Sequence, residues 1–101
     1  MRKLTKSYEE HLAESLQDPE EAAAYLTAAL EDEDPRMFLL ALQDVATARG
    51  IGMSDLATAA KLNRENLYRI LSEKGNPQFS SLKAVLEALD FQLAIQSKQA
   101  G

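Results

Sequence analysis

The sequence contains no cysteine, no tryptophan and a single histidine, His11. Without cysteine, neither a disulfide framework nor a thiolate metal site can form. One histidine cannot supply the ligand clusters that are typical of protein metal sites. We therefore expect no metal and no cofactor, and the lack of disulfides fits a reducing cytoplasm.

Long apolar runs are also absent. No stretch of about 18 apolar residues, the length needed to cross a bilayer as a helix, occurs in the chain. Residues 1–7 are basic, but they lead into Glu9 and Glu10, where a signal peptide would carry an apolar stretch. We expect a cytoplasmic protein that does not bind membranes.

The residue types that catalysis requires are scarce as well. The sequence has no glycine-rich phosphate loop and no carboxylate pair beside a plausible nucleophile. His11 lies in a polar N-terminal segment, where a histidine is more often solvated than catalytic. We expect that the chain is not an enzyme.

Charge is distributed unevenly along the chain, whose net charge is −5. Residues 1–35 hold three basic and ten acidic residues, net −7, whereas residues 49–74 hold five basic and three acidic residues, net +2. Because the screening length at physiological salt is about 8 Å, a DNA backbone responds to local charge. The acidic total therefore does not exclude a sequence-specific DNA-binding surface in the middle of the chain.

Helical signals dominate the 101 residues, which are enough for one compact core. Asp18-Pro19 and Asp34-Pro35 are typical helix starts, Gly50 is a typical helix end, and Ser80 or Ser81 can cap a last helix that runs to Leu89. The helix over residues 35–49 is apolar over more than half of its circumference, which predicts a central core helix. The other predicted helices span residues 8–16, 19–31, 54–60 and 64–71.

Residues 53–71 carry the pattern that is most informative about function. Two helices of seven to eight residues are separated by a three-residue break, Ala57 is small enough for a close helix approach, and Asn63 can cap the second helix. This is the spacing of a helix-turn-helix, whose second helix enters a major groove about 12 Å wide. The same spacing also occurs in scaffolds that bind no DNA, so spacing alone leaves both possibilities open.

The free face of the second short helix supplies the candidate DNA-binding residues. Arginine can contact O6 and N7 of guanine together, and glutamate can accept a hydrogen bond from cytosine. Tyrosine and serine can reach phosphate, and the start of the first short helix can present backbone amides and a hydroxyl to phosphate. The predicted site residues are Ser54, Lys61, Arg64, Glu65, Tyr68, Arg69, Ser72 and Lys74.

Residues 91–96 alternate apolar and polar side chains, which is the period of a β-strand. A lone strand needs a partner, and pairing with the same strand of a second subunit would give a two-fold homodimer. Such a dimer would bind DNA half-sites about 34–36 Å apart. The alternative is an irregular chain that continues over the core. We predict a short C-terminal strand that serves dimerisation.

Several segments between Asp18 and Ile95 together resemble one known family. They are DPEEAAAYL over residues 18–26, Asp34-Pro35 with FLLAL over residues 38–42, DVA over residues 44–46, Leu56-Ala57, LNRENLY over residues 62–68, GNP over residues 75–77 with Phe79, and Leu82, Val85, Leu86 and Leu89. In this joint pattern the chain resembles the Xre-like antidote proteins of bacterial addiction modules, the HigA-like antitoxins.

The resemblance implies an all-α, lambda-repressor-like helix-turn-helix bundle with extra N-terminal helices. It implies an antitoxin that blocks a small RelE/ParE-like toxin and represses its own operon by binding double-stranded operator DNA. Carried over by position, Arg64, Glu65 and Arg69 face the bases, and Ser54 contacts the DNA backbone. The expected organisation is an acidic N-terminal helical segment, residues 1–33, and a DNA-binding domain with the dimerisation strand, residues 34–101, in one compact unit.

The acidic first third has a candidate use, because the resemblance implies a basic toxin that an acidic arm could attract and cover. The alternative is that its acidic residues are solvated helix faces. A stand-alone prophage-type regulator of the lambda-repressor class would use the same short helices without a toxin. A third possibility is an interaction module whose helix-turn-helix no longer binds DNA.

Three positions depart from the family pattern. Lys61 stands in the turn where the family often carries glycine, and a left-handed conformation there would cost roughly 1 kcal/mol. Met53 stands where glutamine often grips phosphate, and methionine cannot. Asp90 stands where glycine usually ends the helix, although aspartate tolerates the left-handed conformation better than most residues.

Overall fold

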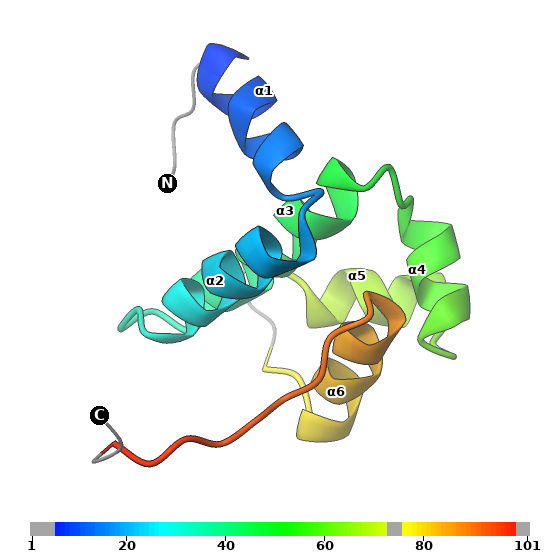
Figure 1. The fold of residues 1–101 in the computed structure, drawn as a ribbon. Coiled ribbons are helices and arrows are strands. Elements are labelled where there is room, and N and C mark those ends of the chain that lie inside the picture. Colours follow the sequence, from blue (N-terminus) through cyan, green and yellow to red (C-terminus); the bar gives the residue numbers. More distant parts are fainter. Residues whose placement is uncertain (1–5, 73–75, 99–101) are drawn as a thin grey trace.

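The computed structural model describes residues 6–72 and 76–98, and every regular element in these ranges is an α-helix (Figure 1). The prediction of an all-α fold is confirmed for this part of the chain, and the helix positions agree closely with the predicted ranges. The helices are α1 (Lys6–Ser15), α2 (Pro19–Leu30), α3 (Arg36–Ala48), α4 (Met53–Ala59), α5 (Arg64–Ile70) and α6 (Phe79–Ala88).

The start of α2 follows from two local residues, as the sequence predicts. The Oδ1 atom of Asp18 accepts a hydrogen bond of 2.9 Å from the backbone N–H of Glu20. Pro19 is the first residue of the helix, where its missing N–H has no helical partner to lose. The cap fixes where the chain turns from α1 into α2, and Leu16, between the two helices, is buried in the core.

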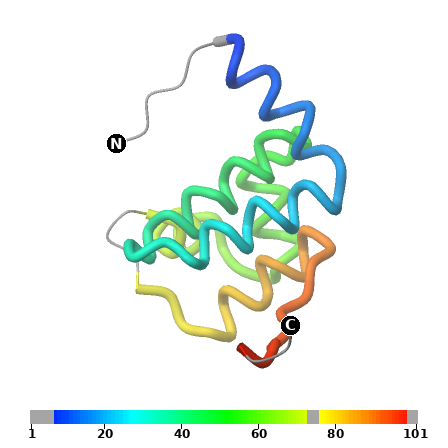
Figure 2. The backbone as a smooth tube through the Cα atoms, turned by 60° about the vertical axis from the view of Figure 1, so that its left-hand side comes forward, coloured from blue at the N-terminus to red at the C-terminus, as the bar shows by residue number. Residues whose placement is uncertain are grey.

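Helix α3 is the central helix, and both α1 and α2 pack against it (Figure 2). Residues from two adjoining faces of α3 are buried, including Leu39 as well as the apolar stripe around Leu42 and Val45. Its Gln43 side chain donates a hydrogen bond of 2.6 Å to the backbone carbonyl of Leu71, directly after α5. The helix therefore joins the N-terminal pair of helices to the α4–α5 pair, as its broad apolar surface predicts.

One apolar core joins all the described helices, and no polar or charged residue in the described ranges is buried. Full burial of a leucine, isoleucine, valine or phenylalanine contributes roughly 1.5–3 kcal/mol, so this core dominates the stability of the fold. Its buried members are Leu16, Ala22, Leu26, Phe38, Leu39, Ala41, Leu42, Val45, Ala46, Leu56, Ala57, Ala60, Leu67, Ile70, Leu71, Val85, Leu86 and Leu89.

Three helices end in the same left-handed turn. Gly50, Lys61 and Asp90 have φ values of 70°, 59° and 66°, so the left-handed conformations predicted for Lys61 and Asp90 are confirmed. The residue after each turn donates its N–H back into the preceding helix, as from Leu62 to the Ala57 carbonyl at 2.8 Å. This 6→1 bond is that of a Schellman motif, which satisfies carbonyl groups at the end of the helix.

The short C-terminal strand predicted over residues 91–96 is wrong for the single chain. These residues have no regular secondary structure, and they leave α6 as an extended segment (Figure 1). After Phe91, whose N–H bonds to the Leu86 carbonyl at 2.8 Å, no backbone–backbone hydrogen bond joins residues 92–96 to another described residue. A strand exists only with a ladder partner, and the described part of this chain offers none.

The predicted serine cap of α6 is also wrong. The helix begins at Phe79, before both serines, and Gln78 takes the cap position without a side-chain hydrogen bond to the helix. The chain enters α6 from Pro77, whose ring disfavours a helical conformation at the residue before it. The helix therefore cannot include Asn76, and it starts at Phe79, ahead of both serines.

Candidate nucleic-acid interface

Helices α4 and α5 pack against each other across a turn of four residues, 60–63. Lys61 closes the end of α4 in its left-handed turn, and Asn63 starts α5. The Oδ1 atom of Asn63 accepts a hydrogen bond of 2.7 Å from the backbone N–H of Asn66. Both helices place their apolar residues inward, and the buried ones are Leu56, Ala57, Leu67 and Ile70.

The opposite face of α5 is polar and exposed. Arg64, Glu65, Tyr68 and Arg69 all lie on the surface, and Tyr68 retains 49% of its accessible area. Lys61 in the turn and Ser54 in the first turn of α4 are exposed as well. Six of the eight predicted site residues therefore lie at the surface, four of them on α5 and the other two on the α4–turn segment. We call this set the α5 face.

The two arginines of the α5 face rest against their own helix. The Arg64 guanidinium donates to the Tyr68 hydroxyl at 3.3 Å and lies 5.4 Å from the centroid of its ring. Arg69 donates to the side-chain oxygen of Asn66. Surface pairs at this helical spacing contribute about 0.2–0.5 kcal/mol. A bidentate contact with guanine is worth roughly 1–3 kcal/mol of discrimination, so either arginine can leave its helix partner for a base.

Of the two remaining predicted site residues, Ser72 is described, and it is not on the α5 face. Ser72 is half-buried, and its hydroxyl donates a hydrogen bond of 2.9 Å to the backbone carbonyl of Arg69. The hydroxyl therefore satisfies a carbonyl at the end of α5. Lys74 lies outside the described residues.

Met53 is the first residue of α4, and the structure shows what it contributes instead of a phosphate contact. Its side chain is half-buried and packs against the core. The cap residue before it is Gly52, which has no side chain to accept a hydrogen bond from the helix. A phosphate at this position would meet the uncapped backbone amides of the first turn of α4, together with the hydroxyl of Ser54.

Three polar residues beside the α5 face were missed by the sequence analysis. A pocket of about 410 Å³ adjoins α5, and its lining includes Asn66, Arg69, Gln78 and Ser81. Asn66 could have been found, since it lies three residues after the cap Asn63 and three before Arg69. Gln78 and Ser81 come from the start of α6, and their approach to α5 is a consequence of helix packing that no local pattern reports.

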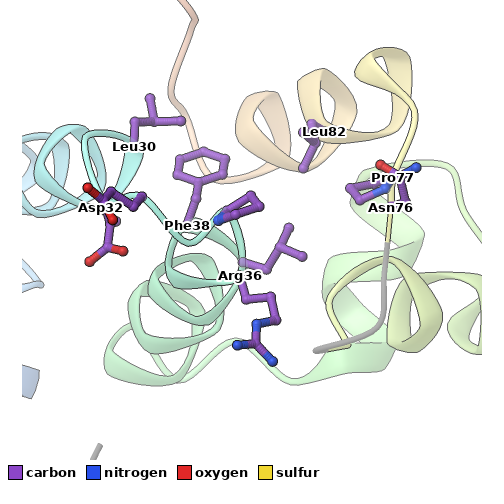
Figure 3. A pocket seen from close by; sticks show the side chains of 11 residues that line it. Leu30, Asp32, Arg36, Phe38, Asn76, Pro77 and Leu82 are labelled. Carbon is purple, nitrogen blue, oxygen red and sulfur yellow. The ribbon is translucent and has the colours of Figure 1, made fainter. Parts of the chain in front are cut away.

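A second pocket, of about 320 Å³, lies between the end of α2, the start of α3 and the start of α6 (Figure 3). Its walls are largely apolar, with Phe38 and Leu39 from α3 and Leu82 from α6. Leu30, at the last position of α2, lines it and is 54% exposed. We call this hollow the acidic pocket, because the charged residues that line it include Asp32 and Glu33.

The charged residues that line the acidic pocket are Asp32, Glu33 and Arg36, so its lining carries one net negative charge, and the surrounding chain is more acidic. Residues 31–36 hold four acidic residues and one basic residue, net −3. Arg36 donates to both carboxylate oxygens of Asp34, with its closest nitrogen 2.7 Å from Oδ2. These hydrogen bonds hold the pKa of the Asp34 carboxyl below its ordinary value. Because Arg36 and Asp34 neutralise each other, the carboxylates of Glu31, Asp32 and Glu33 dominate the local field.

Residues 6–72 and 76–98 lack two other functional features. No group of three or more histidine, cysteine, aspartate or glutamate side chains there is arranged to hold a metal ion. No helix in the same ranges has the length and apolar character needed to cross a membrane.

Comparison with known proteins gives two matches that cover most of the chain. The family model described as "Probable addiction module antidote protein" matches residues 6–97. A Haemophilus influenzae protein described as "Uncharacterized protein" is 39% identical over 88 residues, which is 87% of this chain and 89% of that protein. No solved structure shows significant similarity to the chain. The family match includes all six helices and the extended segment that follows α6.

Proposed function

The chain belongs to the family of probable addiction module antidote proteins, and we propose that it is the antitoxin of a toxin–antitoxin pair. It would neutralise a small basic toxin of the RelE/ParE-like class and, as a homodimer, bind its own operator and repress its operon. The match over residues 6–97 is the observation that carries the antitoxin role. The resemblance to HigA-like, Xre-type proteins supports the toxin class and the autoregulation. Both activities are binding rather than catalysis, and both would take place in the cytoplasm.

The α5 face is the surface that we assign to operator DNA. With α5 in the major groove, Arg64 and Arg69 would contact guanine, and Glu65 would accept a hydrogen bond from cytosine. Lys61 and the first turn of α4 would hold the phosphate backbone on one side. The exposure of these groups on one side of a capped helix supports this assignment, and the net charge of −5 limits nonspecific binding.

The acidic pocket is the surface that we assign to the toxin. An arginine or lysine of a basic partner could lay its aliphatic stem on Leu30 and Phe38 and place its charged head near Asp32 or Glu33. Opposite charges of this kind guide association and orient the partner. The hollow thus offers apolar contact for the stem of an arginine or lysine and carboxylates for its charged head.

DNA binding is tested by fluorescence anisotropy with the duplex just upstream of the coding region, at about 150 mM salt so that nonspecific binding is suppressed. The test variant is Arg64→Ala/Arg69→Ala. The matched control is Lys83→Ala/Lys98→Ala, which removes the same charge from exposed positions outside α4 and α5. We expect the first variant to lose the preference for operator over a scrambled duplex and the control to keep it. Equal binding of both duplexes by the unmodified protein would contradict operator recognition.

Toxin neutralisation is tested by co-expression with the product of the small gene beside this one and by growth of the host. The unmodified protein should restore growth, and Glu33→Lys should weaken the rescue. Glu87→Lys makes the same charge change on the exposed side of α6 and should rescue fully. Specific operator binding without any rescue of growth would favour a stand-alone regulator over an antitoxin.

A further inference from the structure

The extended segment after α6 borders a groove that differs in charge from both the α5 face and the acidic pocket. The groove has a volume of about 320 Å³, and its walls are α2, α6 and the segment itself. Leu26, Leu30, Phe38 and Leu86 make its apolar floor and sides, and none of its lining residues is charged. We call it the neutral groove. Residues 91–97 are also free of charge.

The lack of charge restricts which partner the neutral groove can take. A basic protein is matched by the acidic pocket, not by a surface without carboxylates. Two copies of this chain each carry a net charge of −5, and an uncharged surface lets them meet without placing carboxylates against each other. The neutral groove and residues 91–97 together form such a surface, so its charge fits a second copy of the same chain.

The segment itself lacks the contacts that an apolar extended chain normally makes. Ile95 is fully exposed, and Leu93 retains 43% of its accessible area. Phe91, Leu93 and Ile95 alternate with polar or small residues, so an extended chain places them on one side. The backbone groups of residues 92–96 have no backbone partner within the described chain. An edge of this kind is a template for another strand.

We propose that two copies pair their 91–97 segments as an antiparallel ribbon around a two-fold axis at Ala94. In this register Leu93 of one copy lies opposite Ile95 of the other, and both side chains are on the same face of the ribbon. Ile95 of each copy then covers the neutral groove of its partner, which its own chain leaves open. The same surface serves both copies, as a two-fold interface requires. The proposal rests on the homodimer proposed above, but it does not depend on toxin binding.

A single introduced cysteine tests the position of the axis, because the natural chain has no cysteine. Directly opposed residues of an antiparallel pair have Cα atoms about 4.5–5.5 Å apart, which a disulfide can bridge. Under mild oxidation, Ala94→Cys should form covalent dimers at least about tenfold faster than Glu20→Cys, since pairing raises the effective thiol concentration. Glu20 is exposed on α2 and serves as the control. Equal rates for the two variants would overturn the proposed axis.

Light scattering of the full chain tests the apolar contact. The unmodified protein should be a dimer, Ile95→Asp should be a monomer, and circular dichroism should show unchanged helix content. Phe79→Asp, at another exposed apolar residue on the first turn of α6, should remain a dimer. A monomeric unmodified protein would overturn both this interface and the homodimer. A dimer that survives Ile95→Asp would uphold the homodimer and overturn this interface, and neither result bears on the growth-rescue test.

Discussion

The guanidinium of Arg49, directly after α3, donates a hydrogen bond of 2.6 Å to the backbone carbonyl of Leu89, directly after α6. The same guanidinium lies over the ring of Phe91, 4.9 Å from its centroid. One half-buried side chain thus connects the end of the central helix to the end of α6 and to the start of the extended segment. The sequence predicts a helix that ends at residue 49, but the carbonyl that Arg49 binds belongs to a residue 40 positions away.

Replacing Arg49 with alanine should lower the free energy of unfolding by roughly 2–4 kcal/mol. A hydrogen bond to a charged group contributes about 1.5–3 kcal/mol, and an exposed cation–π contact adds about 0.5–1 kcal/mol. Urea denaturation followed by circular dichroism measures the change. Arg49→Lys keeps the charge without the planar guanidinium, so its free energy of unfolding should lie between those of the original protein and Arg49→Ala. An Arg49→Ala protein as stable as the original would contradict the role given to this contact.

Replacing Lys61 with glycine should raise the free energy of unfolding by up to about 1 kcal/mol, since glycine adopts a positive φ without strain. The observed φ of 59° is the source of this strain. Lys61→Ala is the matched control, because it removes the same charge and keeps the Cβ atom. Thermal and urea unfolding should show that Lys61→Gly is more stable than Lys61→Ala. The absence of any difference would mean that the turn is relaxed as it stands.

Replacing Asn63 with alanine should cost about 1 kcal/mol, the usual contribution of a helix N-cap. The change removes the acceptor for the Asn66 N–H, which lies 2.7 Å away. Asn63→Asp retains an acceptor at the same place and should unfold like the original protein. Hydrogen exchange at Asn66 should accelerate in Asn63→Ala. An unaltered exchange rate there would count against the cap as the element that orients α5.

The Asp34–Arg36 pair should be visible in the titration of Asp34. Its hydrogen bonds with Arg36 lower the pKa of the carboxyl from 3.8, so Arg36→Ala should raise that pKa toward 3.8. Because the folded pKa is the lower one, the contribution of the pair to stability is complete above pH 3.8 and is lost as the pH falls through the lowered pKa. NMR titration of the Asp34 side chain in both proteins measures the shift. A pKa that is unaffected by Arg36→Ala would refute this assignment.

Much of the helical fold could be predicted from neighbouring residues. The cap at Asp18, the cap at Asn63 and the turn at Gly50 are all where the sequence places them. The apolar side chains that recur at helical spacing in α3, α4 and α5 are mostly buried, among them Leu42, Leu56 and Leu67. A helix satisfies its backbone within four residues and repeats its faces every 3.6 residues, so its position and inward side are recorded in local spacing.

Two features of the surface could not be predicted in this way. Leu30 belongs to the apolar stripe of α2 and would be expected in the core, yet at the last position of the helix it is 54% exposed. Its exposure creates the wall that the acidic pocket and the neutral groove share. Gln78 and Ser81 likewise join Asn66 and Arg69 only because α6 packs beside α5.

The alternation over residues 91–96 could be interpreted only in part from the sequence. Local pattern correctly indicates an extended chain with one apolar side, but a strand also requires a hydrogen-bonding partner at a distance, and pattern carries no information about whether the chain supplies one. The helices, their caps and the residues of the α5 face could therefore be predicted from residues that are neighbours in the sequence. The pockets, the Arg49–Leu89 contact and the unpaired segment arise from how the helices pack, because each depends on groups that meet only in the folded chain.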